Sequence, residues 1–229
     1  MSQKILLIVT SHDRLGETGK PTGFWLEELA APYRTFVEAG AEVDIASPKG
    51  GRPPVDPGSE KSDSADVAWF RANADAMTKL ETTKKLESVT SDAYDAYFVV
   101  GGHGVMWDLA DHAASRALLA RAFDGGRVVA AVCHGPGALV NVKLASGAPI
   151  VRGRRVAGFS DEEEAAVKLE EIVPFRLESR LRELGGKYER GPMWSAFAVR
   201  DGRLVTGQNP QSSVAAAKET LAALREARA

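Results

Sequence analysis

Short β-branched, apolar runs alternate with longer stretches of helical periodicity through most of the 229-residue chain. The runs with the length and composition of buried strands are residues 4–9, 42–46, 96–100, 128–132, 155–158, 196–199 and 204–206. Leu, Ala, Phe and Val recur at three- and four-residue spacing in residues 24–39, 110–123, 176–184 and 213–226, which predicts helices there. This alternation predicts an α/β fold: a doubly wound, mostly parallel sheet with helices on both faces.

Glycines mark the ends of several of these elements. Gly40, Gly125-Gly126 and Gly185-Gly186 follow three of the predicted helices, where left-handed C-terminal caps are expected. An Asp-Gly pair at 201–202 separates the last two strands and predicts a β-hairpin. The sheet is therefore expected to end in an antiparallel pair.

One region departs from the strand–helix alternation. Residues 48–63 are rich in proline and glycine without an apolar period, so a loop is predicted, whereas residues 65–86 are Ala- and Lys-rich and predict helix. We expect a single domain over 1–229 in which residues 48–86 form a loop and helical insertion over one end of the sheet.

Charge and hydropathy exclude several classes of partner. Lys+Arg number 29 and Asp+Glu 31, giving a net charge of −2 without a basic cluster, so a nucleic-acid partner is not expected. The longest apolar runs fall far short of the roughly 20 residues that span a bilayer, so no membrane association is predicted. With one cysteine, no intrachain disulfide can form, and no apolar signal-peptide segment precedes the first strand. These features favour the cytoplasm.

The strand predicted at 128–132 ends directly in Cys133, and glycine follows two residues later. This order resembles a nucleophile elbow, a sharp strand-to-helix turn with small residues two positions before and after the nucleophile, here Ala131 and Gly135. The turn would present the thiol at the carboxyl end of the sheet, where ligands bind in open α/β folds. It would also aim the thiol at a helix N-terminus, which is expected to lower the pKa of Cys133. A structural cysteine is the alternative, but packing requires neither the turn nor the following His134.

A second glycine-rich turn follows the strand predicted at 96–100. Glycine lets backbone N–H groups approach a ligand closely, so the amides of Gly102 and His134 are expected to form an oxyanion hole if the two turns lie side by side.

Glu27 and Glu28 stand near the start of the helix predicted at 24–39. Acidic residues in a first helical turn are usually solvated. Pro32, however, cannot donate a hydrogen bond to the carbonyl of Glu28, so we expect a kink at this carboxylate.

Four consecutive acidic residues, 161–164, follow the strand predicted at 155–158. Such runs are commonly solvated helix starts. A histidine beside a nucleophile nevertheless needs a carboxylate to fix its tautomer, and this run can supply one.

The histidines show no spacing typical of a metal site. His12, His103, His112 and His134 include no i,i+4 pair, and a single cysteine allows no Cys-x-x-Cys motif, so no metal site is predicted. A partial ligand set of Cys133, His103 and Glu28 is the remaining alternative.

These segments together resemble the DJ-1/PfpI superfamily, in its Hsp31-like branch of glutathione-independent glyoxalases and chaperones. The matching segments, 4–10, 22–32, 102–104, 130–136, 158–161 and 201–210, occur in the family's order and cover most of the chain outside 48–86. The resemblance implies a flavodoxin-like, class I glutamine amidotransferase-like fold and a homodimer.

The resemblance also implies site residues. The family's nucleophile falls on Cys133, its neighbouring histidine on His134, and the acid beside the nucleophile on Glu28 rather than Glu27. Glu164 matches the acid that supports the histidine, although 161–163 compete for that position. Gly102 and His134 match the oxyanion-binding amides.

The implied reaction converts methylglyoxal and related small 2-oxoaldehydes to 2-hydroxy acids through a cysteine hemithioacetal, with Glu28 moving a proton between adjacent carbons. The resemblance implies no cofactor: the reaction requires no metal, nucleotide or glutathione.

Other functions remain open from the residues alone. Cys133 can instead be oxidised as a redox sensor, or serve with His134 and an acid in an amidase or peptidase. A stress chaperone would instead bind clients at an exposed apolar patch. Trp25, Trp107 and Trp194 are candidates to line a pocket in any of these functions.

Overall fold

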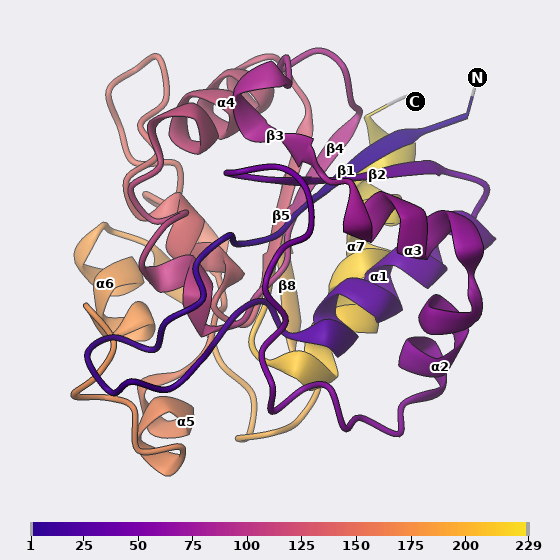
Figure 1. The fold of residues 1–229 in the computed structure, drawn as a ribbon. Helices are drawn as coiled ribbons and strands as arrows, with labels where there is room; N and C mark the ends of the chain where they lie inside the picture. Colours follow the sequence, from indigo (N-terminus) through magenta and orange to yellow (C-terminus); the bar gives the residue numbers. More distant parts are fainter. Residues whose placement is uncertain (1, 228–229) are drawn as a thin grey trace.

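The central sheet separates two layers of helices in the computed structural model, which describes residues 2–227 (Figure 1). Its seven strands lie in the order β3-β2-β1-β4-β5-β9-β8. They are β1 (Lys4–Ile8), β2 (Glu42–Ser47), β3 (Lys84–Lys85), β4 (Ala96–Val99), β5 (Val128–Val132), β9 (Leu204–Gly207) and β8 (Ala198–Asp201). All neighbours are parallel except β8 and β9. This is the predicted doubly wound α/β fold.

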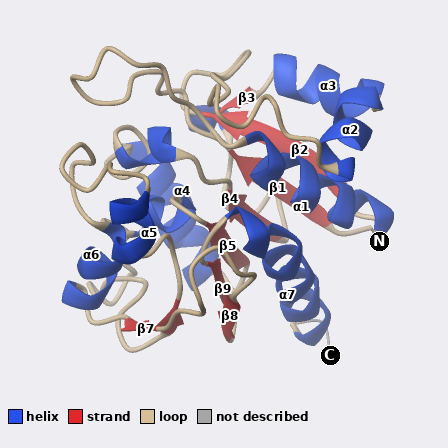
Figure 2. Ribbon diagram, turned by 90° about the horizontal axis from the view of Figure 1, so that it is seen from below, coloured by secondary structure: helices blue, strands red, loops and turns tan. Residues whose placement is uncertain are grey.

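Helices α1 (Leu26–Glu38) and α7 (Ser213–Glu226) cover one face of the sheet, and α4 (Ala113–Asp124), α5 (Asp161–Ala166) and α6 (Leu177–Glu183) lie on the other side (Figure 2). Strands β4 and β5 are buried along their whole length because helices cover both faces, which explains their unbroken apolar sequences. Phe36 of α1 meets Phe98 of β4 edge to face, with ring centroids 5.8 Å apart. Among residues 2–227, none of the helices combines the length and apolarity needed to cross a membrane.

The predicted ends of the elements are largely confirmed. Gly40, Gly126 and Gly185 have positive φ angles of 81°, 83° and 85° beyond helix ends. The predicted hairpin joins β8 to β9, with Asp201 paired to Leu204 across a two-residue turn. That turn consists of Gly202 and Arg203 rather than the predicted Asp-Gly pair.

The helical stretch predicted at 65–86 is wrong as a single element. It consists of α2 (Ala65–Ala72), α3 (Ala74–Glu81), the edge strand β3 and a 3₁₀ turn (Leu86–Ser88). Asn73 divides the two helices because its extended backbone stops α2 while its side chain accepts a hydrogen bond from the amide of Ala76 and caps α3.

The two parts of the 48–86 region lie in different places. The loop before α2 pairs with the segment that leads into α1, since the Phe24 amide donates to Pro54 O at 3.0 Å. Helix α2 packs against α1, and α3 packs against β2.

The strand predicted at 155–158 is shorter than expected and lies outside the main sheet. It is β6 (Arg155–Val156), and it pairs with an unpredicted strand, β7 (Lys187–Tyr188). The edge of β9 away from β5 is already occupied by β8, so β6 cannot join there. Instead, the amide of Ala157 is satisfied by Thr206 Oγ1 at 2.7 Å.

Candidate active site

The strand order reverses between β1 and β4, and such reversal points are where ligands bind in open α/β sheets. Strands β4 and β5 pair beside this point, with Val99 opposite Ala131. The glycine turn after β4 and Cys133 after β5 therefore leave the sheet at the same edge. The two sequence motifs that were 30 residues apart meet here because parallel strands end together.

Cys133 occupies a strained elbow, as predicted. Its φ of 58° lies in the left-handed region that non-glycine residues rarely adopt. Hydrogen bonds on both sides fix this backbone: the Cys133 amide donates to Gly207 O at 3.0 Å, and the Phe159 amide donates to Cys133 O at 2.8 Å. A β-carbon on Gly135 would lie 2.4 Å from Val99 O, so the turn also depends on the small residue that the motif predicts.

Glu28 lies against Cys133 although it belongs to a helix about 100 residues earlier in the chain. Its side chain is completely buried. The start of α1 is held at this edge because the Trp25 amide donates to Gly101 O at 3.1 Å. A β-carbon on Gly101 would lie 2.2 Å from Glu28 Oε2 and 2.9 Å from Cys133 Cβ, so only glycine leaves room for the carboxylate and the thiol together.

Burial dominates the electrostatics of this pair. It raises the pKa of Glu28 well above 4.5, and the Cys133 thiol and the Gly101 amide, which face the carboxylate, offset only part of the rise. Burial and the nearby Glu28 carboxylate raise the pKa of the Cys133 thiol as well. The expectation that a helix N-terminus lowers this pKa is therefore wrong: the helix that follows is only the short 3₁₀ segment Gly135–Leu139, and burial outweighs it. The pair resists losing its protons.

His134 lies on the other side of the thiol, within a hydrogen-bonded network. Its Nδ1 is 3.4 Å from Cys133 Sγ, and its Nε2 is 2.8 Å from Glu164 Oε2. Burial and the neighbouring His103 lower the pKa of His134, which favours the neutral ring. Burial alone would raise the pKa of Glu164, but His134 and His103 outweigh that effect and hold it well below 4.5, so the carboxylate is ionised.

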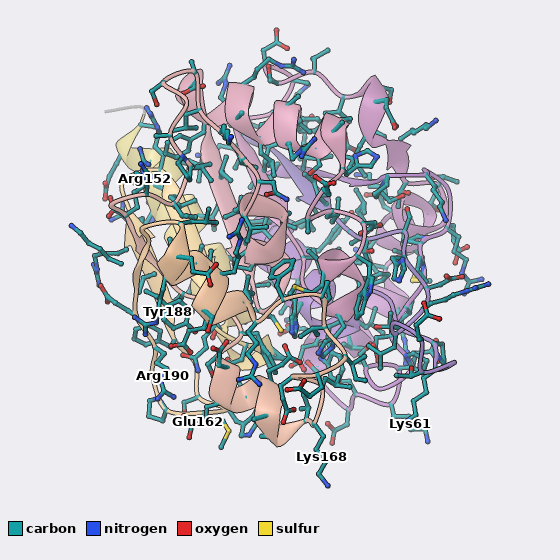
Figure 3. All side chains as sticks on the ribbon, turned by 90° about the vertical axis from the view of Figure 1, so that its left-hand side faces the viewer. Lys61, Arg152, Glu162, Lys168, Tyr188 and Arg190 are labelled. Carbon is teal, nitrogen blue, oxygen red and sulfur yellow. The ribbon has the colours of Figure 1, made fainter. Side chains whose placement is uncertain are left out.

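The other acids of the 161–164 run have different positions. Glu163 is also buried, but its carboxylate accepts hydrogen bonds from Ser160, Asn209 and the Trp194 amide. Glu162 is exposed and pairs with Arg190. Figure 3 shows Glu162 and Lys168 near the two ends of α5, the helix that brings Glu164 to His134.

Aromatic rings continue from His134 toward the surface. The Phe159 ring lies 4.4 Å from the His134 ring, and Trp194 lies 5.7 Å beyond, centroid to centroid. Trp194 is 40% exposed and has a φ of 59°. Of the three tryptophans considered from the sequence, Trp194 is thus connected to the site, whereas Trp107 stacks on His12.

The two predicted oxyanion-binding amides come from the turns that follow β4 and β5. The His134 amide is directed at the Cys133 sulfur. Gly102 has a φ of 106°, and a β-carbon there would lie 2.4 Å from Gly23 O, so this turn also requires glycine.

The structure thus brings the side chains of Cys133, His134, Glu28 and Glu164 together. Gly102 lies in the turn after β4, and Glu27 is half-buried. His103 was expected only as a member of a partial metal-ligand set, although its Nε2 is 2.8 Å from Glu164 Oε1. Its position directly after Gly102 was the available signal.

One cluster within residues 2–227 has donor atoms suited to a metal ion. The donor atoms of His103, His134 and Glu164 lie within 4.8 Å of one another. This set differs from the partial one considered from the sequence, in which Cys133 and Glu28 accompanied His103.

Comparisons with known proteins agree with this geometry. A sequence model described as the DJ-1/PfpI family matches residues 21–223. The chain is 30% identical to "Glyoxalase 3" of Candida albicans, over 96% of this chain and 98% of that protein. It is 31% identical to the glutathione-independent glyoxalase HSP31 of Saccharomyces cerevisiae, over 97% of this chain and 98% of that protein.

Solved structures are also similar to this chain over nearly its whole length. The crystal structure of glyoxalase III from Candida albicans superposes with a TM-score of 0.89 at 30% identity, covering 96% of this chain and 97% of that one. The Rapid Encystment Protein 24 KDa of Francisella tularensis superposes with a TM-score of 0.93 at 36% identity, covering 97% and 99%. A family match over most of the chain, with an elbow cysteine and a buried glutamate at one sheet edge, shows that this chain belongs to the DJ-1/PfpI family.

Proposed function

We propose that this protein is a glutathione-independent glyoxalase that converts methylglyoxal and related 2-oxoaldehydes to 2-hydroxy acids, with lactate the product from methylglyoxal. The observation that carries the proposal is the buried Glu28 carboxyl against the Cys133 thiol, because burial raises the pKa of Glu28, as a carboxyl that both accepts and donates a proton requires. The relatives named as glyoxalases support the same reaction.

The first step forms a carbon–sulfur bond. The sulfur of Cys133 adds to the aldehyde carbon, and the carbonyl oxygen becomes the hemithioacetal oxygen. The amides of Gly102 and His134 stabilise the negative charge on this oxygen while it forms. His134 Nδ1, 3.4 Å from the sulfur, takes up the thiol proton as the carbon–sulfur bond forms and passes it to the hemithioacetal oxygen.

The second step moves a proton between neighbouring carbons. Glu28 as the carboxylate removes the proton from the former aldehyde carbon, giving an enediolate, and as the acid returns it to the adjacent carbon. The hydroxyl proton passes from the hemithioacetal oxygen to the neighbouring oxygen. The former aldehyde carbon is oxidised to a thioester and its neighbour is reduced to an alcohol, so no external oxidant or reductant is consumed. Water then hydrolyses the thioester, which releases the hydroxy acid and the Cys133 thiol.

The closure of the site favours a small substrate. Cys133 is 4% exposed, and Glu28 and His134 are essentially inaccessible. A peptidase needs an open groove for a chain on both sides of the nucleophile, so this geometry argues against the peptidase alternative. A redox sensor normally uses an accessible, low-pKa thiolate, whereas burial raises the pKa of Cys133.

We further propose that the protein acts as a cytoplasmic homodimer. The family resemblance supports the dimer. The lone, buried Cys133 fits a compartment in which thiols stay reduced.

The proposed activity is tested by following lactate formation from methylglyoxal without glutathione. The wild-type protein is expected to form lactate, and Cys133→Ala is expected to lose at least about a thousandfold in kcat because no hemithioacetal can form. Equal lactate formation by both proteins, or by neither, would contradict the proposal.

A further inference from the structure

Two imidazole rings share the Glu164 carboxylate. His134 Nε2 lies 2.8 Å from one oxygen, and His103 Nε2 lies 2.8 Å from the other. The two rings also pack on each other, with centroids 4.0 Å apart. Glu164 and His134 are almost fully buried, whereas the His103 side chain keeps 13% of its surface exposed.

An ionised carboxylate only accepts hydrogen bonds, so each Nε2 facing it carries a proton. For neutral His134 this leaves the Nδ1 lone pair toward the Cys133 sulfur. His103 satisfies the second oxygen, Oε1. Without His103, this oxygen of a buried carboxylate would lose its donor, and Glu164 would be free to rotate away from His134.

We propose that His103 is a positioning residue, which holds Glu164 and through it fixes the orientation and tautomer of His134. His103 also directly follows Gly102, so the hydrogen bond ties the turn carrying one oxyanion amide to the helix carrying the acid. The hydrogen bond thereby fixes the turn after β4 relative to helix α5. Part of this inference rests on the proposed function, since kcat is one of its readouts.

Two substitutions separate the hydrogen bond from packing. In His103→Gln, the amide nitrogen replaces the imidazole Nε2 at similar reach, whereas His103→Leu fills the space without a donor. We expect His103→Leu to lower kcat roughly 10- to 100-fold with KM changed less than about twofold, and His103→Gln to retain kcat within about threefold. His112→Gln, at a histidine that caps α4 and pairs with Glu87, is the matched control and should leave kcat unchanged.

Alkylation of Cys133 by iodoacetamide at fixed pH tests the coupling without any turnover. His103→Leu and Glu164→Gln are expected to slow alkylation to a similar extent, roughly tenfold, and the double variant to be no slower than either, since both changes break one chain of contacts. His103→Gln should alkylate at nearly the wild-type rate. If His103→Leu does not fold, His103→Asn, whose amide is too short to reach Glu164, replaces it.

The outcomes are distinct. Alkylation of His103→Leu at the wild-type rate would overturn the positioning role. Alkylation slowed equally in His103→Leu and His103→Gln, with unchanged melting temperatures, would overturn it as well. Failure of the wild-type protein to form lactate, with alkylation behaving as described, would overturn the proposed function and leave the positioning role supported.

Discussion

Glu28 and Glu164 are two buried carboxyls whose environments shift their pKa values in opposite directions. Burial raises the pKa of Glu28, whereas two histidines lower that of Glu164 despite its burial. One carboxyl is thereby suited to carry a proton and the other to remain an anion. This division of roles follows from the neighbours, since the residue type is the same.

The raised pKa of Glu28 makes a prediction about stability. A folded-state pKa above the ordinary 4.5 means that the folded protein binds this proton more tightly, so the contribution is present below pH 4.5 and is lost as the pH rises through the folded pKa. Because an amide does not titrate, the Glu28→Gln variant does not lose this stability as the pH rises. Its melting temperature relative to wild type should therefore increase from pH 4.5 to pH 8, as measured by calorimetry across that range.

Glu164→Gln should show the opposite pH dependence of stability. The lowered pKa of Glu164 stabilises the fold above pH 4.5, and that stability is lost as the pH falls through the folded pKa. This variant should be destabilised most at neutral pH and least in acid. A flat difference for both variants across the pH range would contradict the assigned pKa directions.

Gly101→Ala tests the contact between Glu28 and Cys133 sterically. The added methyl group would lie 2.2 Å from Glu28 Oε2 and 2.5 Å from Val132 O, so the carboxylate must move. We expect a loss of about 1–3 kcal/mol in stability together with a large loss of lactate formation. Gly147→Ala, where the surrounding space is open and only the φ of 80° disfavours alanine, should lower stability while leaving turnover near wild type.

At the scale of elements, Glu163 holds the loop carrying Trp194 to the start of α5. Its Oε1 accepts from the Trp194 amide at 2.9 Å and from Asn209 Nδ2 at 2.8 Å, while Oε2 accepts from Ser160. Glu163→Ala leaves these donors unsatisfied and should cost about 3 kcal/mol, which corresponds to roughly 6–12 °C in melting temperature. Glu162→Ala, on the exposed face of α5, should cost less than about 1 kcal/mol, and an equal loss in both variants would show that Glu163 is not an anchor.

The elements themselves were largely predictable, because apolar periodicity reports burial directly. The strand over 128–132 was predicted with its exact bounds. Strands β3 and β7 were missed because each has only two residues, too few to show a period. The break at Asn73 was missed because one polar residue that ends one helix and caps the next leaves the composition of the segment unchanged.

The site was predictable only where a local motif carried it. The elbow at Cys133 follows from its own neighbours, whereas the partnership of Glu28 with Cys133 depends on a contact across about 100 residues and came from family resemblance. The choice of Glu164 over Glu163 came from the family resemblance, because local pattern does not separate two acids that are both buried in the first turn of the same helix. The raised pKa of Cys133 required the extent of burial, which no local pattern gives.

At the scale of the whole molecule, the sheet draws strands from both ends of the chain, and β5 and β9 pair although more than 70 residues separate them. Helix α7 packs on α1, which joins the last element to the first helix. We propose that the chain is one folding unit, with the 48–86 region attached to it. Calorimetry should then show a single transition whose calorimetric and van't Hoff enthalpies agree, while two resolved transitions would indicate separate domains.

In the proposed reaction, Glu28 moves the proton while Cys133 holds the substrate. Lactate formation from methylglyoxal without glutathione should be compared between Glu28→Gln and Glu27→Gln, two variants with the same chemical change at adjacent positions. Glu28→Gln is predicted to lose roughly 100- to 10,000-fold in kcat, because an amide neither accepts nor returns the proton, and Glu27→Gln should stay within about twofold of wild type. Turnover by Glu28→Gln at the wild-type rate would contradict proton transfer by Glu28.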